Sequence, residues 1–143
     1  MTADPMDAEL ETLADEFSLF DDWEERYRYI IDLGRTLEPV SPAEHTDENK
    51  VRGCASQVWL VTELRQDGAI HFRGDSDAHI VRGLIAILLR LYRDRTPAEI
   101  LAFDARGAYE RLGLGGALTA QRSNGLFSMV ERIRKDAQAA APA

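Results

Sequence analysis

The residue best suited to chemistry is the single cysteine of the chain, Cys54. Gly53 precedes it, and glycine adopts backbone angles that residues with a Cβ atom resist. The small polar residues Ser56 and Gln57 follow, and an apolar run of strand-like composition begins at Val58. We therefore expect Cys54 on a tight loop at the start of a strand, where a rigid scaffold can present a reactive side chain. A free cysteine is often only a small buried hydrophobe, but these neighbours are not those of a core position.

A single thiol restricts the chemistry that the chain can carry out. It allows no intramolecular disulfide and no Cys-x-x-Cys redox pair. Structural zinc sites and iron–sulfur clusters usually take four ligands, and the chain adds only His45, His71 and His79, without metal-binding spacing. The roles left for Cys54 are attack as a thiolate, transport of a sulfur or acyl group, or simple packing. A cation such as Arg52 favours the thiolate if it points toward the sulfur.

Residues 53–59 read Gly-Cys-Ala-Ser-Gln-Val-Trp. This stretch closely resembles the sulfur-acceptor loop of the SufE family, whose usual form is Gly-Cys-x-Ser-Gln-Val-Trp. Other parts of the family pattern occur in the same order, so the resemblance runs from about Trp23 to Arg134. These parts are residues 23–34, 74–78, 81–86, 118–119, 122–123 and 125–126. A match of this length with preserved spacing is far more specific than the cysteine motif alone.

The resemblance implies a function in sulfur transfer. SufE-like proteins take sulfane sulfur from the persulfide of a pyridoxal-phosphate-dependent cysteine desulfurase of the SufS or CsdA type, and they stimulate that enzyme. They carry the sulfur on the loop cysteine and pass it to an iron–sulfur cluster scaffold of the SufBCD type. Such a chain needs no cofactor of its own beyond a transient cysteine persulfide, because the pyridoxal phosphate belongs to the partner.

The same resemblance assigns site residues by position. They are Cys54 as the acceptor, with Gly53, Ser56, Gln57, Asp77 and Arg122 as binding or supporting residues. Asp77 and Arg122 match positions that are tied in the family to desulfurase contact and to positioning of the active loop. Alternatively, Asp77 only caps the helix that follows it, and Arg122 is an ordinary surface arginine.

Two other functions fit a single thiol. In one, the chain binds and activates a cysteine desulfurase without carrying sulfur. In the other, the thiol senses oxidants by forming sulfenic acid or by becoming glutathionylated. A cysteine protease or amidase needs a partnered histidine, and no such signature is present. For a carrier, we expect Cys54 to be shielded in the resting protein and exposed on docking, because an apolar flank follows it.

The composition suits one domain that spans residues 1–143, since 45% of the residues are hydrophobic. The formal net charge is −8, which argues against nucleic-acid binding because phosphates are neutralised by Lys and Arg. No apolar run is long enough to span a bilayer and no secretory signal is visible. We therefore expect no membrane contact and a cytoplasmic location. Every charged residue before Arg26 is acidic, which indicates either a solvated face or steering toward a basic partner.

The hydrophobic patterns predict an α+β fold in which a small antiparallel sheet packs against helices, and the resemblance implies the SufE/IscU-like fold. Residues 58–64 and 69–74 should form a hairpin around a turn at Gly68. Two strands alone are marginal, so a third is expected from the residues just before Cys54. His71, on the second strand, should be an outward polar residue.

Helical spacing predicts the elements that must cover this sheet. Residues 78–92 are apolar almost all round, which is typical of a buried central helix. Gly83 within it should allow close packing against the strand after Cys54. Residues 37–50 lack periodicity and predict a long, mobile loop that leads to Cys54. The other helices are expected at about 6–17, with acidic character, and at 22–33, 97–103, 108–112 and 119–137, before a disordered Ala-rich tail at 137–143.

Overall fold

The structure is a computed structural model that describes residues 5–53, 56–114 and 120–140 of the chain. Within this part, helices surround one two-stranded antiparallel sheet. The elements are α1 Pro5–Phe17, α2 Trp23–Gly34, the 3-10 helix η1 Pro42–Glu44, β1 Val58–Leu64, β2 Ile70–Ser76, α3 His79–Tyr92, α4 Pro97–Ala102, α5 Ala105–Leu112 and α6 Ala120–Ala140. The predicted α+β class is confirmed. Among the described residues, no helix combines the length and the apolar character needed to cross a membrane.

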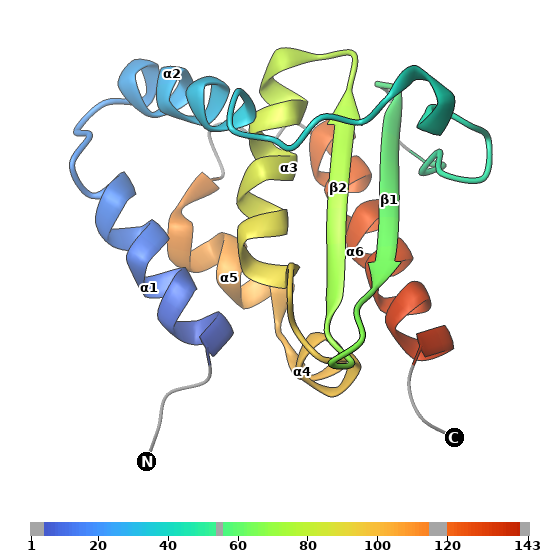
Figure 1. Cartoon of the computed structure of the whole chain (residues 1–143). Helices are drawn as coiled ribbons and strands as arrows, with labels where there is room; N and C mark the ends of the chain where they lie inside the picture. Colours follow the sequence, from blue (N-terminus) through green and yellow to red (C-terminus); the bar gives the residue numbers. More distant parts are fainter. Residues whose placement is uncertain (1–4, 54–55, 115–119, 141–143) are drawn as a thin grey trace.

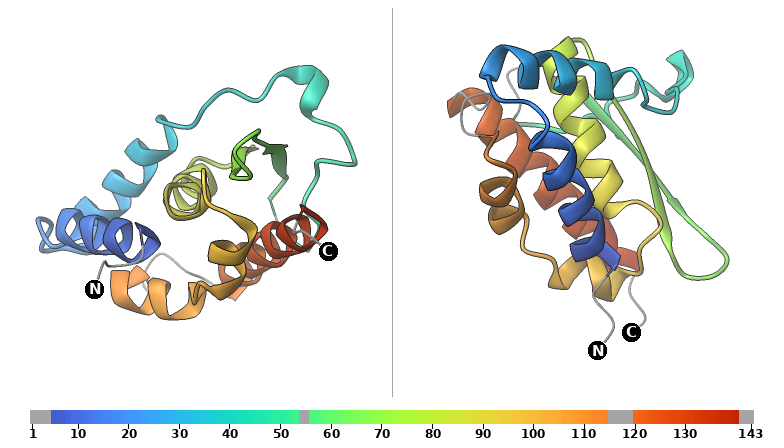
Figure 2. Two further views of the ribbon diagram at one scale, coloured as in Figure 1. Left: turned by 60° about the horizontal axis from the view of Figure 1, so that its bottom comes forward. Right: turned by 90° about the vertical axis from the view of Figure 1, so that its left-hand side faces the viewer.

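Helix α3 is the centre of the fold. Its sequence is apolar on nearly every side, and ten of its 14 residues are buried, including Leu84, Ile85, Leu88 and Tyr92. It contacts α1, α2, α6 and β2. Figures 1 and 2 show α3 with α1 and α2 on one side and the β1–β2 hairpin on the other. Since such a helix is stable only when it is covered, α3 is the scaffold on which the other elements are placed.

The hairpin has one face toward the core and one face away from it. Its strands pair from Val58 with Ser76 to Leu64 with Ile70, and the turn residue Gly68 has a φ of 89°. Side chains alternate between the faces of a strand. Phe72 is buried in the core, and a Cβ atom on Gly74 would lie 2.9 Å from Ile85 of α3. The residues between them, such as Arg73, therefore lie on the outward face.

Two sequence predictions are wrong, one about a third strand and one about the start of a disordered tail. The residues before Cys54 form only an isolated bridge between Lys50 and Trp59, and the described sheet contains two strands. The pairing is too short for a third strand, and the hairpin is instead supported by α3. The predicted disordered tail does not begin at residue 137, because α6 continues to Ala140. Ala137 is fully buried, and this packing keeps the last turns helical.

Gly83 serves a different contact from the predicted one. It packs against α2 rather than against the strand after Cys54, and a Cβ atom on it would overlap the carbonyl oxygen of Ile30. A Cβ atom on Gly34, the last residue of α2, would lie 2.8 Å from the nitrogen of Gly83. The missing side chains therefore let the two helix backbones approach each other closely.

Replacing Gly83 with alanine should lower the free energy of unfolding by about 2 kcal/mol. Forcing a methyl group against a backbone carbonyl costs about 3 kcal/mol, whereas alanine returns about 1 kcal/mol of helix propensity. Urea denaturation measures the difference. The control is Ala98→Gly at an exposed helical position. It measures the difference in helix propensity between alanine and glycine without a packing change. A Gly83→Ala protein as stable as the wild type would contradict the close contact between α2 and α3.

Candidate functional site

The predicted acceptor, Cys54, and its neighbour Ala55 lie outside the described residues. The segments on either side of them are described and are paired with each other. Val51 N donates to Val58 O, and Leu60 N donates to Asn49 O, each at 2.8 Å. These bonds bring together the ends of residues 52–57, which we call the cysteine loop. The cysteine loop therefore leaves and rejoins the fold at the start of β1, where the sequence predicts it.

Gly53 is the described residue that leads into Cys54. Two features of its position, the backbone angle and a close neighbour, each require glycine. Its φ is 90°, a value that residues with side chains rarely adopt. A Cβ atom on Gly53 would also lie 2.6 Å from Oγ of Ser128, which belongs to α6. Gly53 thus rests directly on α6. The sequence predicts the special backbone of Gly53 but not the helix that it contacts.

Asp77 holds the other end of the cysteine loop. Its Oδ1 atom accepts a hydrogen bond from Gln57 N at 3.1 Å, and its own backbone N donates to Gln57 O at 3.3 Å. The N-cap of α3 is Ala78, which makes no side-chain capping bond. The alternative in which Asp77 only caps this helix is therefore wrong. Asp77 fixes the residue at which the cysteine loop joins β1, whereas its contact with a desulfurase stays a prediction.

For the remaining predicted site residues, the structure gives the position or the exposure but no contact that defines a role. Arg122 belongs to the first turn of α6, but its side chain lies outside the described part of the structure. Its role in positioning the loop stays a prediction, as does the shielding of Cys54. Ser56 is half-buried and Gln57 is exposed, while Arg52 is an exposed cation on the loop.

Arg132 of α6 also holds the chain that leads to Cys54, and sequence reasoning missed it. Its Nη2 atom donates to Glu48 O at 2.7 Å and its Nη1 atom donates to Lys50 O at 3.5 Å. The guanidinium also pairs with Asp136 at 3.3 Å, and this carboxylate accepts the hydroxyl of Thr62 at 2.7 Å. The spacing of Arg132 and Asp136 on a helix is visible in the sequence, but the carbonyls that Arg132 reaches are 82 and 84 residues away.

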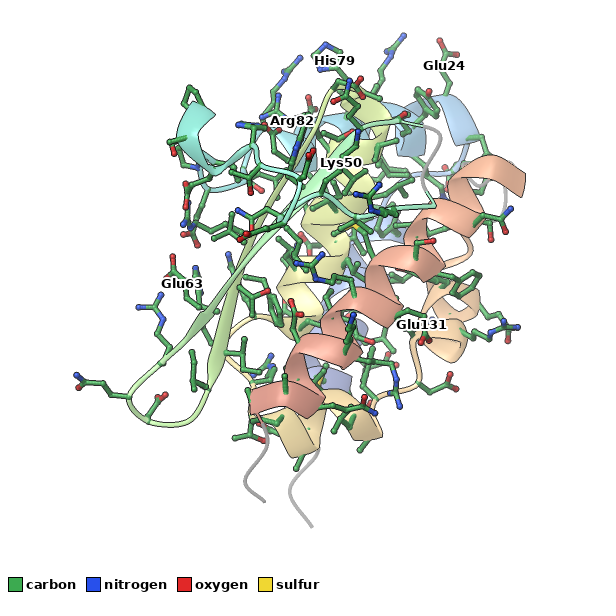
Figure 3. All side chains as sticks on the ribbon, turned by 90° about the vertical axis from the view of Figure 1, so that its right-hand side faces the viewer. Glu24, Lys50, Glu63, His79, Arg82 and Glu131 are labelled. Carbon is green, nitrogen blue, oxygen red and sulfur yellow. The ribbon has the colours of Figure 1, made fainter. Side chains whose placement is uncertain are left out.

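An open hollow lies between residues 47–52, which lead into the cysteine loop, and α6. Figure 3 looks onto this face and shows Lys50 on the segment before the loop and Glu131 on α6. Both signs of charge line it, so it has no strong preference for an anion or a cation. Its lining residues are Asp47, Glu48, Lys50, Val51, Arg52, Ser128, Glu131, Arg132 and Lys135.

Two of the three histidines, His45 and His71, have both ring nitrogens beside acceptor atoms. His45 Nδ1 lies 2.8 Å from Ser41 O and Nε2 lies 2.9 Å from Asp75 Oδ2, so neither nitrogen is left to take a proton from a thiol. The sequence predicts His71 as an outward polar residue. It does lie on the outward face of β2, but only 6% of it is exposed because Glu38 and Asp94 cover it. Among the described residues, which exclude Cys54, no cluster of His, Asp or Glu is placed to bind a metal ion.

Comparison with known proteins gives consistent likenesses. A family model described as SufE, Fe-S metabolism associated domain, matches residues 11–137. An uncharacterized SufE-like protein of Rhizobium etli is 51% identical over 139 residues, which cover 95% of this chain and 94% of that protein. Another, from Rhizobium meliloti, is 46% identical over 137 residues, with 94% and 98% covered.

A solved structure shares the fold at low sequence identity. The solution structure of a hypothetical protein from Thermus thermophilus aligns with a TM-score of 0.75 and 18% identity. The alignment covers 92% of this chain and 95% of that chain. The arrangement of helices around a small sheet is therefore common to both proteins.

Proposed function

The chain belongs to the SufE family and its role lies in Fe–S metabolism, and from this premise we propose that it carries sulfur as a persulfide on Cys54. The donor is a cysteine desulfurase of the SufS or CsdA type, which the chain also stimulates. The recipient is an iron–sulfur cluster scaffold of the SufBCD type. The chain contributes the thiol and the loop, and the donor contributes the pyridoxal phosphate.

The observation that carries this proposal is the attachment of the cysteine loop at both ends. Gly53 rests against Ser128 of α6, and Gln57 is bonded to Asp77 at the start of α3. A short loop whose ends are both fixed confines the residues between them to a limited region beside a rigid scaffold. This arrangement suits a thiol that must meet two different partners in turn, and it would be unnecessary for a cysteine that only packs in a core.

The transfer is an exchange between sulfur atoms. The thiol proton of Cys54 passes to solvent, and the thiolate attacks the outer sulfur of the donor's persulfide. The bond between the two donor sulfurs breaks, the donor cysteine leaves as a thiolate, and Cys54 then carries the outer sulfur. A thiolate of the recipient repeats this attack on the Cys54 persulfide, and no external oxidant or reductant is consumed. The exposed Arg52 guanidinium lies two residues from Cys54 and can favour its thiolate form.

A turnover assay tests the proposal. The desulfurase is supplied with cysteine, and alanine formation is measured with the untreated chain and with the chain alkylated by iodoacetamide, which marks only Cys54 because no other cysteine exists. We expect untreated chain to accelerate turnover and alkylated chain to have no effect. Equal acceleration by both forms would show an activator that does not carry sulfur, and would overturn the proposal.

Asp77 variants separate a positioning role from a contact with the partner. Replacing Asp77 with alanine removes the acceptor for Gln57 N, so we expect sulfur acceptance to slow about tenfold, the value of one hydrogen bond to a charged group. The Asp77→Asn variant keeps an acceptor oxygen, so its rate of sulfur acceptance should fall much less. Initial rates of alanine formation measure both. If Asn is as harmful as Ala, the negative charge itself is needed, and the positioning role is wrong.

A further inference from the structure

The segment between α2 and the cysteine loop, Arg35 to Lys50, is attached to the fold in an unusual way. We call it the strap. Figure 1 shows it crossing in front of α3 and the hairpin, over the outward face of the sheet. All of its residues are described, and none of them is buried. Burial of apolar side chains is the main force that holds a chain in place. The strap contributes only partly buried side chains such as Leu37, which packs against the core, so it depends largely on polar contacts.

Three ionic anchors provide these contacts, and they occupy alternate residues of β2. His71 lies 2.9 Å from Glu38, Arg73 lies 2.6 Å from Glu44, and Asp75 lies 2.9 Å from His45. Alternate residues of a strand share a face, so the anchors form a row under the strap. On the strap, Glu38 lies near the start, Glu44 belongs to η1 and His45 follows η1 directly. Arg73 also donates to Pro39 O at 3.0 Å and pairs with Glu63.

Two of the three anchor pairs contain a histidine. Both ring nitrogens of each histidine face acceptor atoms. The nitrogens of His45 face Ser41 O and the Asp75 carboxylate, and those of His71 face the carboxylates of Glu38 and Asp94. A neutral imidazole has one N–H and one lone pair. It would therefore point a lone pair at an oxygen in either site. Only the protonated ring, with two N–H groups, satisfies all four contacts.

The acidic groups around each ring raise the pKa of that histidine. Asp75 and Glu44 raise the pKa of His45 above its usual value, chiefly through the Asp75 hydrogen bond. Arg82 is the opposing charge, with its Nε 3.2 Å from Asp75. Burial alone lowers the pKa of His71, but Glu38 and Asp94 outweigh it and the pKa is raised.

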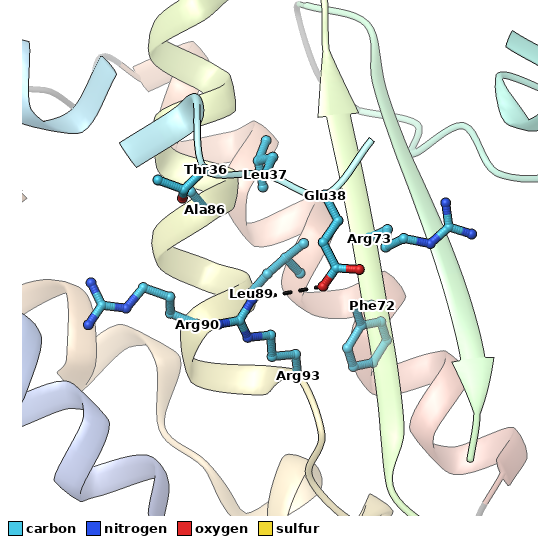
Figure 4. A pocket seen from close by; sticks show the side chains of 9 residues that line it. All are labelled: Thr36, Leu37, Glu38, Phe72, Arg73, Ala86, Leu89, Arg90 and Arg93. Atoms are coloured by element: carbon cyan, nitrogen blue, oxygen red, sulfur yellow. Dashed lines mark ion pairs between the residues drawn. The ribbon is translucent and has the colours of Figure 1, made fainter. Parts of the chain in front are cut away.

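The start of the strap is not closely packed on the helix below it. Figure 4 shows a pocket there, lined by Thr36, Leu37 and Glu38 of the strap and by residues of α3 and β2. Glu38 reaches across this pocket to Arg93 at 4.0 Å, as the dashed line in the figure marks. The contacts of Glu38 with His71 and Arg93 are thus what closes the strap over the pocket.

We propose that the strap is a protonation-dependent fastening, closed while His45 and His71 carry their second protons and loosened when they lose them. A group whose pKa is raised on folding stabilises the fold below its unfolded pKa and ceases to do so as the pH rises through the folded one. The strap is therefore fastened in mildly acidic solution and loosens as the pH increases above about 6.5, the ordinary value for histidine. Arg73 stays charged throughout, and its pair with Glu44 remains, as do the bonds from Arg132 to the carbonyls at the end of the strap.

Loosening has a consequence for the cysteine loop, and this step rests on the proposed function. Asn49, at the end of the strap, accepts a hydrogen bond from Leu60 of β1, next to the pair that closes the cysteine loop. A released strap holds Asn49 less firmly at this bond. The pH then controls how firmly the start of the cysteine loop is held.

Amide hydrogen exchange on the full chain tests the fastening without any sulfur donor. Exchange of strap peptides is followed by mass spectrometry between about pH 6 and pH 9, after correction for the intrinsic pH dependence of amide exchange. We expect protection of the strap to fall about tenfold or more over this range, while α3 stays protected. Constant protection of the strap would overturn the proposal, whatever the outcome for sulfur transfer.

Histidine variants identify the groups responsible. His45→Gln and His71→Gln should each reduce strap protection at pH 6 and flatten its pH profile. His79, labelled in Figure 3, is the first residue of α3 and takes part in none of the three anchors, so His79→Gln is the matched control and should change nothing. Since the buried His71 variant could unfold, NMR titration of the His45 and His71 rings in the wild type is the second measurement. Strap loosening that does not follow these titrations, or that follows His79, would contradict the proposal.

Discussion

Replacing Cys54 with serine is expected to abolish sulfur acceptance. A hydroxyl cannot attack a persulfide as a thiolate does, because the alcohol is not ionised near neutral pH and forms no stable bond of this kind to sulfur. Transfer of sulfur to the recipient should therefore fall to the level seen without the chain. The measurement is sulfur delivery from desulfurase to scaffold, with the Cys54→Ser protein in place of the wild type.

The Cys54→Ser variant also separates the proposed carrier from its alternatives. A pure activator needs no thiol, so the serine protein would still support full delivery. For an oxidant sensor, the wild type would show no dependence on the desulfurase, and the effect of the substitution would appear only under oxidising conditions. Binding of the variant to the desulfurase, measured by calorimetry, should remain and serves as the control for correct folding.

The second large effect is expected for Gly53→Ala, which should slow sulfur acceptance about tenfold or more while leaving the fold intact. Alanine at a φ of 90° is strained by about 1–3 kcal/mol. Its Cβ atom also overlaps Oγ of Ser128, 2.6 Å away. Because the described contacts hold the cysteine loop at its ends, the strain is relieved by moving the loop, and the thiol with it. Initial rates of alanine formation by the desulfurase measure the loss.

Two further variants separate the causes of the Gly53→Ala effect. Ser128→Ala removes the overlapping oxygen, so the Gly53→Ala, Ser128→Ala double variant should recover part of the rate but not the part due to φ. Gly68 has almost the same φ, 89°, in the hairpin turn, and a Cβ atom added to it would meet no described atom within 4 Å. The Gly68→Ala variant therefore introduces the same backbone strain at a position outside the cysteine loop. It should accept sulfur at the wild-type rate. A Gly53→Ala protein with the wild-type rate would show that this anchor does not position the thiol.

The elements with strong local patterns were predictable from the sequence. Strand β1 is the predicted stretch Val58–Leu64, and the Thr96 capping box begins α4 as expected. The errors concern contacts between distant elements. The position of Gly83 in a buried helix predicts a close neighbour, but helical spacing alone does not say that this neighbour is Ile30 of α2. Likewise, residues 37–50 lack periodicity because polar anchors rather than a buried face hold them.

The candidate site was predictable only in part, for the same reason. The motif predicts Cys54 and its flanking residues as the site, because a motif of this kind is local in sequence. The bond between Asp77 and Gln57, which spans 20 residues, showed a role that local capping rules did not suggest. Arg132 was missed because it donates to backbone carbonyls, which leave no signal in the identity of Glu48 or Lys50.

The most direct test of the central claim is the intact mass of the chain after incubation with its desulfurase and cysteine. We predict a gain of about 32 Da, one sulfur atom, that reductant removes and that the Cys54→Ser protein does not show. The desulfurase alone, without cysteine, should give no gain. Wild-type chain that stays at its original mass while the desulfurase turns over, or a gain that persists in Cys54→Ser, would contradict a persulfide carried on Cys54.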